Sequence, residues 1–373
     1  MSTPIKEQAL KTEEYFLNVG PQHPSTHGVL HLLMRMEGEN IVDVEPQLGY
    51  IHRSIEKMSE SQTYWQLNTL ASRMDYLSAH IYNQACALAV EKALGVEIPD
   101  KAKAIRILMA ELTRLSSHQL WWGVMGMDLG AFTPFFHGWC DRESIVEIFE
   151  KNCGNRLTMN YIVPGGVTDD VHPDFVKDVK EYIEFFKGRL EEYEELLTNN
   201  RIFIERSQGV GVITKEDVIG YGCSGPLARA SGVSCDVRKR HPYDGYDQLE
   251  FEEPIEYEGD CLARYKVRIR EMWQSISIIE QLIDNIPEGD HKAKMKKVLK
   301  VPKGEYYQRV ETARGELGVF LVGDGTNKPY RLKYRTPNFS NLGAFPKASR
   351  GEKMADISAN LAAFDFVIPD IDR

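Results

Sequence analysis

Three histidines spaced four residues apart are the first residues in this sequence that could do chemistry. They are His23, His27 and His31, in the run HPSTHGVLH. On an α-helix this spacing would place three imidazoles on one face, where they could bind a metal ion. Pro24, Gly28 and the alternating pattern that follows argue against a helix, and no glutamate of the HExxH kind accompanies them. Two interpretations stay open: a turn capped by its own side chains, or a loop that presents a histidine to a ligand.

Charged and phenolic side chains also interrupt an apolar stripe further along the chain. Residues 72–77 read SRMDYL, and Arg and Asp are rarely buried unless they are paired. This run is either an internal salt bridge beside a core tyrosine, or a site where the phenol of Tyr76 donates a hydrogen bond. Asp128 is a single carboxylate in an apolar segment, so it needs a cationic or hydrogen-bonding partner such as His or Arg.

Two further motifs carry weaker signals. Residues 220–225 read GYGCSG and match GxGxxG, but the nearest strand-like run, 210–213, is too far upstream, and Pro226 and Gly232 spoil a following helix. A structural glycine-rich loop is therefore predicted, and this chain is not expected to bind NAD. Residues 229–239 alternate charged and small side chains. They form either a solvated surface or an interface that grips an acidic or cluster-bearing partner.

Composition narrows the functional classes. The chain has 373 residues and a net charge of −10, which disfavours nucleic acid as a partner. Its six cysteines include no CxxC pair, so a zinc ribbon, a thioredoxin motif and a self-contained iron–sulfur ligand run are excluded. The polar N-terminus predicts no signal peptide, and the thiols are expected to be reduced in a cytoplasmic compartment. No segment has the apolar length that a membrane span needs.

The elements that must position these residues are mainly helical. Alternating residues over 29–44, with a turn at 37–40 and an end at Pro46, predict a β-hairpin. Apolar stripes at helical spacing predict four long amphipathic helices, at 54–94, 101–122, 173–199 and 260–285, and hence a bundle. The last 70 residues are expected to form short strands and loops packed on this bundle.

The predicted fold class is mainly α with small β elements. The expected organisation is a polar arm over residues 1–18 followed by a single domain over 19–373. That domain divides into a β element (19–50), a helical bundle (51–300) and an irregular β-containing C-terminal part (301–373).

Several motifs in order give the chain a family resemblance from residue 15 to 373. They are GPQHPSTHG (20–28), GYIHR (49–53) with Glu56 and Lys57, RMDY (73–76), MDLGAFTP (127–134), PGG (164–166), GPLARASG (225–232), GD (259–260), REM (270–272) and DR (372–373). In these motifs the sequence resembles the D subunit of respiratory complex I, the NADH–quinone oxidoreductase. The resemblance implies the helical-bundle fold of the nickel–iron hydrogenase large subunit, to which this family is related.

The comparison with hydrogenases bears on metal binding. Where the hydrogenase helix reads RxCxxC, this chain has Asp75 and Ser78 at the two cysteine positions, and residues 365–373 contain no cysteine either. Four thiolates are missing, so nickel and iron cannot be held. No metal ligand is assigned to this chain, and hydrogenase activity is excluded.

The resemblance also implies roles for single residues. Tyr76 and His27 would hydrogen-bond the two carbonyl oxygens of a quinone head group, and Asp128 would be the partner of His27, which makes these three the catalytic residues. His23 would contribute to binding the quinone. Arg53 and Arg73 would lie towards the terminal iron–sulfur cluster, which is carried by the adjacent B subunit. This chain itself would bind no cofactor.

One position departs from the family pattern. Many members have a histidine six residues before the proline of PGG, near the terminal cluster, whereas this chain has Thr158. A threonine cannot change its charge with pH, so the cluster potential is predicted to depend less on pH here. This favours a low-potential quinone such as menaquinone.

The resemblance implies a peripheral protein on the cytoplasmic side of a bacterial inner membrane. Expected partners are the B, C and I subunits of the peripheral arm, the H subunit of the membrane arm and a membrane quinone. The complex would be a proton-translocating NADH–quinone oxidoreductase, and the isolated chain would be inactive. Alternatives are a sister complex fed by ferredoxin or F420H2, and a non-catalytic scaffold between arm and membrane.

Overall fold

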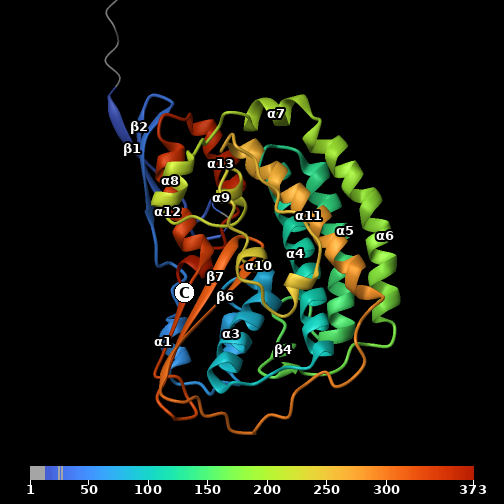
Figure 1. The fold of residues 1–373 in the computed structure, drawn as a ribbon. Coiled ribbons are helices and arrows are strands. Elements are labelled where there is room, and N and C mark those ends of the chain that lie inside the picture. Colours follow the sequence, from blue (N-terminus) through green and yellow to red (C-terminus); the bar gives the residue numbers. More distant parts are fainter. Residues whose placement is uncertain (1–12, 24–25, 27) are drawn as a thin grey trace, which may run out of the picture.

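A computed structural model describes residues 13–23, 26 and 28–373 (Figure 1). An antiparallel sheet lies at the N-terminal end, in the order β1 (Glu14–Val19), β2 (His31–Glu37) and β3 (Asn40–Gln47). The predicted hairpin is confirmed as β2 and β3, with Leu32, Met34 and Met36 buried on one face. Two details were wrong. Residues 14–18, assigned to the polar arm, belong to β1, and β3 runs through Pro46, which an edge strand tolerates.

The helix predicted over residues 54–94 is broken into several pieces. They are α1 (Ile55–Ser59), α2 (Leu67–Ala71), the 3₁₀ turn η2 (Tyr76–Ser78) and α3 (Ala79–Leu94), which ends at Gly95 with a φ of 63°. Asp75 is extended, and its Oδ1 accepts a hydrogen bond of 3.1 Å from the Leu77 N–H. An aspartate that caps the backbone locally competes with helix continuation, which explains the break.

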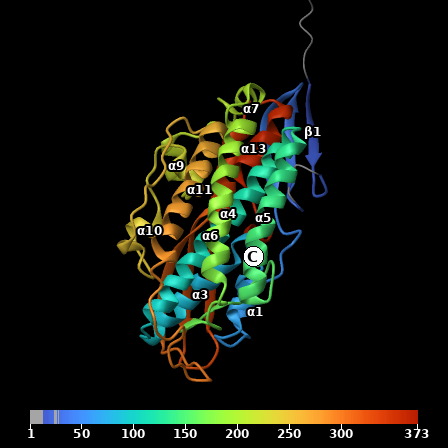
Figure 2. The same cartoon turned by 90° about the vertical axis from the view of Figure 1, so that its right-hand side faces the viewer.

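Four long helices form the bundle: α4 (Asp100–Asp128), α5 (Phe132–Cys153), α6 (Phe175–Tyr193) and α11 (Cys261–Ile283). Three of them confirm predicted amphipathic stripes, whereas α5 was not predicted. Pro134 sits in the first turn of α5, where a proline is tolerated. A Cβ added to Gly126 would lie 2.7 Å from the Cβ of Pro134, so this glycine lets α4 and α5 pack closely. Figure 2 shows these helices side by side.

Short elements join the long ones. They are β4 (Ile162–Val163), β5 (Gly166–Val167), the π-turn η3 (Glu194–Thr198), α7 (Arg201–Ser207), α8 (Lys215–Gly220), α9 (Pro226–Arg229), α10 (Val237–Arg240) and η4 (Tyr246–Gln248). The GYGCSG motif forms the loop between α8 and α9, and Gly222 and Gly225 have φ angles of 65° and 69°. No strand leads into this loop, so the structural-loop interpretation is confirmed.

The C-terminal part combines a sheet with helices. The antiparallel strands β6 (Gly304–Thr312), β7 (Gly315–Gly323) and β8 (Arg331–Arg335) pack on α3. They are followed by α12 (Pro337–Ser349), η5 (Met354–Asp356), α13 (Ile357–Phe364) and α14 (Ile368–Ile371). The expectation of strands and loops alone was therefore wrong for residues 337–371. Helix α13 is buried nearly all round, so its sequence carries no amphipathic stripe.

Three apolar clusters hold these layers together. One fills the bundle, one joins α3 to the C-terminal sheet, and one packs the N-terminal sheet against α12, α13 and α14. The described part of the chain is therefore mainly α with small β elements, as predicted. The division into an arm and one domain stays a prediction.

Candidate functional site

Tyr76 stands on a backbone segment that is anchored by a buried ion pair. The neighbouring Asp75 is fully buried, and its Oδ2 lies 3.1 Å from Nη1 of Arg314 in the β6–β7 turn. The other terminal nitrogen of Arg314, Nη2, lies 2.9 Å from Oδ1 of Asp365, at the end of α13. The guanidinium thus joins the residue before η2 to the residue after α13. The internal salt bridge is confirmed for Asp75, but with an arginine outside the SRMDYL run.

The phenol of Tyr76 points away from the core, with 36% of the residue exposed. The expectation of a core tyrosine was therefore wrong. Partial burial raises the pKa of Tyr76; Arg314 opposes this, while the carboxylates of Asp75 and Asp365 add to it. The phenol consequently keeps its proton at neutral pH and is available to donate a hydrogen bond.

Arg53 and Arg73 lie together, although they come from different segments. Nη2 of Arg53 donates a hydrogen bond of 2.8 Å to the carbonyl of Arg73, and Nη1 of Arg73 donates to the carbonyl of Thr69. Arg53 is exposed and Arg73 is half-buried. Arg73 is three residues before Tyr76 and its carbonyl holds the side chain of Arg53, so both guanidinium groups are tied to the segment that carries the phenol.

The C-terminal end of the chain holds the loop that carries Arg53. The Asp372 carboxylate accepts hydrogen bonds of 3.0 Å from the N–H groups of Gly49 and Ile51. The Nδ1 of His52 lies 2.5 Å from the Asp372 carbonyl oxygen. The terminal DR motif therefore fixes the GYIHR motif across more than 300 residues of sequence, a relation that no local pattern indicates.

The histidine-rich loop is only partly described. His23 is exposed, and its carbonyl accepts hydrogen bonds from the N–H and hydroxyl of Thr26, at 3.1 and 2.8 Å. An isolated bridge pairs His23 with Gly28, so this turn is capped by its own residues, as one interpretation expected. His27 lies outside the described residues. Asp128 is half-buried at the last position of α4, and its pairing with His27 stays a prediction.

Thr158 lies in the loop after α5 and is half-buried. Its carbonyl accepts from Nδ2 of Asn155 at 3.1 Å, and the next residue, Met159, accepts from Nδ2 of Asn83 in α3 at 2.5 Å. One turn earlier in α3 lies His80, which is fully buried. Burial lowers the pKa of His80 to about 3. This imidazole stays neutral at physiological pH, so it does not replace the titrating group that Thr158 lacks.

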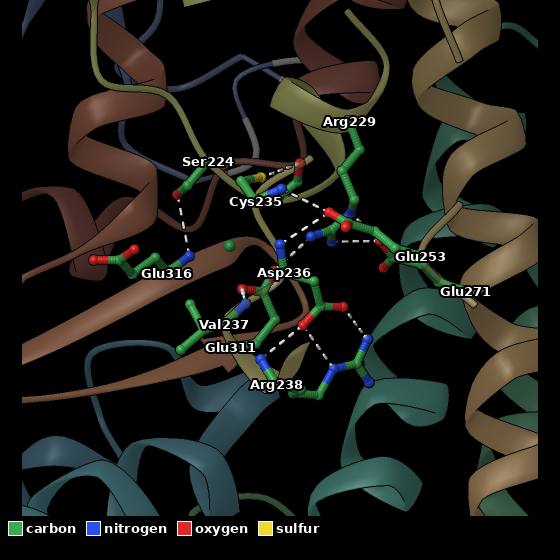
Figure 3. Close-up of polar contacts among 12 residues, drawn as sticks. Ser224, Arg229, Cys235, Asp236, Val237, Arg238, Glu253, Glu271, Glu311 and Glu316 are labelled. Atoms are coloured by element: carbon green, nitrogen blue, oxygen red, sulfur yellow. Dashed lines mark hydrogen bonds and ion pairs between the residues drawn. The ribbon is translucent and has the colours of Figure 1, made fainter. Parts of the chain in front are cut away.

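Three charged residues of the segment 229–239, namely Arg229, Asp236 and Arg238, are internal, whereas Lys239 is exposed. Arg229 lies 2.8 Å from Glu311, and its Nε donates to Glu271 at 2.9 Å. Arg238 lies 2.7 Å from Asp236, and all five side chains are buried. Both interpretations of this segment were therefore wrong for these residues. The cluster joins α9, α10, α11 and β6 (Figure 3).

Among residues 13–23, 26 and 28–373, no three His, Cys, Asp or Glu side chains gather where they could hold a metal ion. The six cysteines are all free thiols. In the same part of the chain, none of the helices is long and apolar enough to cross a bilayer.

Comparison with known proteins first gives the class of protein. The sequence profile of the family described as "Respiratory-chain NADH dehydrogenase, 49 Kd subunit" matches residues 128–300 and 291–373. A Bacteroides thetaiotaomicron protein, named as the C/D subunit of NADH-quinone oxidoreductase, is 50% identical over 372 residues, which cover 99% of this chain and 70% of the relative. The D subunit of NADH-quinone oxidoreductase from Geobacillus kaustophilus is 44% identical, covering 97% of this chain and 99% of the relative.

The chain belongs to the family of D subunits of NADH–quinone oxidoreductase, respiratory complex I. It is therefore a subunit of an oxidoreductase complex, and other complex I subunits are its partners.

Proposed function

We propose that this chain forms the quinone-reducing site of a proton-translocating complex I, together with its neighbouring subunits. The observation that carries the proposal is the placement of Tyr76. Its phenol is partly exposed and keeps its proton, and its backbone is fixed by the buried Asp75–Arg314–Asp365 bridge. A preorganised donor of this kind stabilises an oxyanion that develops beside it.

Reduction of a quinone to a quinol takes two electrons and two protons. The terminal iron–sulfur cluster of the B subunit would supply the electrons. Tyr76 would hydrogen-bond one quinone oxygen and release its proton to it, and His27, charged through its partner Asp128, would serve the other oxygen. His23, on the same loop as His27, would help to hold the head group.

Arg53 and Arg73 would face the cluster in the B subunit. Two guanidinium groups near a cluster favour its reduced form electrostatically, because reduction adds negative charge. Thr158 would lie on the same side and add no charge that changes with pH. The cluster potential would therefore depend less on pH than in relatives with a histidine at this position, which favours a low-potential acceptor such as menaquinone.

The proposed assembly follows from these roles. The B subunit would cover the arginines, the C and I subunits would complete the peripheral arm, and the H subunit would meet this chain at the cytoplasmic surface of the inner membrane. The fusion named C/D in Bacteroides supports the C subunit as a neighbour. The alternative donors ferredoxin and F420H2 would act through other subunits and would leave the roles in this chain unchanged.

The proposal is tested in native membranes with Tyr76→Phe and, separately, His27→Ala. Quinone reductase activity is compared with reduction of an artificial acceptor that takes electrons upstream of the quinone site. We expect quinone reduction to fall by about 100-fold, the scale of a lost proton donor, while the artificial acceptor is still reduced. If both activities survive, these side chains are structural and the scaffold alternative is correct.

A further inference from the structure

A concentration of positive charge lies between α11 and β6, far from the proposed quinone site. Residues 291–303 read HKAKMKKVLKVPK in a chain whose net charge is −10. Lys294, Lys296, Lys297, Lys300 and Lys303 are exposed, and we call them the lysine ridge. The segment runs along the lower edge of the molecule in Figure 1 as an orange coil.

The backbone of this segment is fixed although it is neither helix nor strand. The Ala293 N–H donates to the Gly165 carbonyl at 2.8 Å, and Nε1 of Trp65 donates to the Lys297 carbonyl at 3.1 Å. Leu299 and Val301 are buried in the cluster beneath. The lysines therefore project from a preorganised support, so little backbone entropy would be lost when a partner binds.

The ridge lysines lack the acidic partners that lysines of the bundle have. Lys101, Lys151 and Lys187 lie 2.5, 2.7 and 2.6 Å from carboxylates. Within the described residues, no carboxylate oxygen lies within 4.0 Å of a ridge ammonium group. Five adjacent cations thus remain without a counterion from this part of the chain.

An apolar groove of about 450 Å³ runs beside these cations. Its floor includes Leu94, Met295 and Leu299, and its rim carries Lys294, Lys296 and Lys300. A site of this composition complements a ligand that offers an apolar side chain flanked by carboxylates.

We propose that the groove and the lysine ridge bind an extended acidic segment of a neighbouring subunit of the complex. An apolar side chain of that segment would enter the groove, and its carboxylates would pair with the rim lysines. The side chains that line the groove include no aromatic residue, although aromatic residues are the usual anchors at a bilayer surface. Exposed aromatics, Phe132 and Phe136, instead follow the far end of α4, whose 29 residues span about 43 Å. A protein partner is therefore favoured over lipid.

The site is separated from the quinone chemistry. Helix α3 begins at Ala79, three residues after Tyr76, and its last residue, Leu94, lines the groove, so the two sites lie at opposite ends of a helix about 22 Å long. Changes at the ridge should therefore alter assembly while leaving the turnover of each intact complex unchanged.

The first test joins lysines to carboxylates in the intact, purified wild-type complex with a zero-length carbodiimide. We expect Lys294, Lys296 or Lys300 to form amide links to Asp or Glu of one neighbouring subunit, and mass spectrometry identifies the linked peptides. The proposal would be overturned if these lysines were linked no more often than the control lysines Lys215, Lys347 and Lys353. These three are also exposed lysines without a carboxylate partner in the described chain.

The second test reverses charge with the triple variant Lys294→Glu, Lys296→Glu, Lys300→Glu. The matched control is Lys215→Glu, Lys347→Glu, Lys353→Glu, which changes the net charge equally. We expect the ridge variant to lose the linked subunit at a lower salt concentration than the wild type, and the control variant to behave like the wild type. At 0.15 M NaCl the ridge variant should yield about tenfold less intact complex than the wild type. Equal assembly of the two variants contradicts the proposal. Loss of bound anionic phospholipid from the ridge variant, without loss of a subunit, would identify lipid as the occupant and would also overturn it.

Discussion

Removing the guanidinium that joins the segment of Tyr76 to the end of α13 should destabilise the protein strongly. Arg314 is buried and holds Asp75 at 3.1 Å, Asp365 at 2.9 Å and Ser117 at 3.0 Å. Arg314→Met leaves the buried Asp75 and Asp365 without their ion-pair partner, which costs about 3–5 kcal/mol of unfolding free energy. Adding Asp75→Asn removes one of these charges. The double variant should therefore be more stable than Arg314→Met alone, by about 1–3 kcal/mol.

The assay is urea unfolding of the purified subunit, followed by the fluorescence of the buried Trp121 and Trp122. Arg331→Met is the matched control, because Arg331 also bridges two carboxylates but its side chain is 41% exposed. That change should cost only about 0–1 kcal/mol. Equal losses for the two single variants, or no recovery in the double variant, would refute the view that this bridge anchors Tyr76.

Two further predictions concern pH. Thr158→His should add a pH dependence of up to about 59 mV per pH unit to the potential of the cluster proposed to lie beside it, because a histidine changes its charge with pH whereas threonine does not and the buried His80 stays neutral. Redox titration at two pH values measures it, and a steep slope in the wild type would contradict the reasoning. Burial opposes the ionised form of Glu111, but Arg114 and Arg238 lower its pKa from 4.5 to about 2. The ionised Glu111 therefore contributes about 3 kcal/mol to the free energy of unfolding above pH 4.5, and this contribution is lost as the pH falls towards 2. Glu111→Gln should flatten this part of the profile of urea stability against pH. Parallel profiles for the wild type and the variant would refute the assignment.

Local patterns predicted the elements that have one apolar and one polar face. The hairpin at 31–47 and the helices α4, α6 and α11 follow from the periodicity of their residues. Helix α13 could not be found this way because its residues are buried nearly all round. Helix α5 begins among glycines and a proline, which individually favour a break.

The candidate site was predictable only in the residues that lie in motifs. Tyr76, Arg53 and Arg73 belong to such runs. The partner of Asp75 is 239 positions away in the sequence, and nothing in the residues around Arg314 marks it as that partner. The same holds for Asp372 and Gly49, which are 323 positions apart. The spacing of residues along the chain does not indicate contacts between positions so far apart in sequence. The ion pair and hydrogen bonds that hold the site residues in place were therefore found only in the structure.

The most direct test of the central claim is photolabelling of the intact complex with an azido-quinone. If this chain forms the quinone site, the label should be found on peptides that contain Tyr76 or residues 20–28. Excess quinone should suppress that labelling, and Tyr76→Phe should weaken it. Labelling confined to other subunits, or labelling of this chain that quinone does not suppress, would contradict the account.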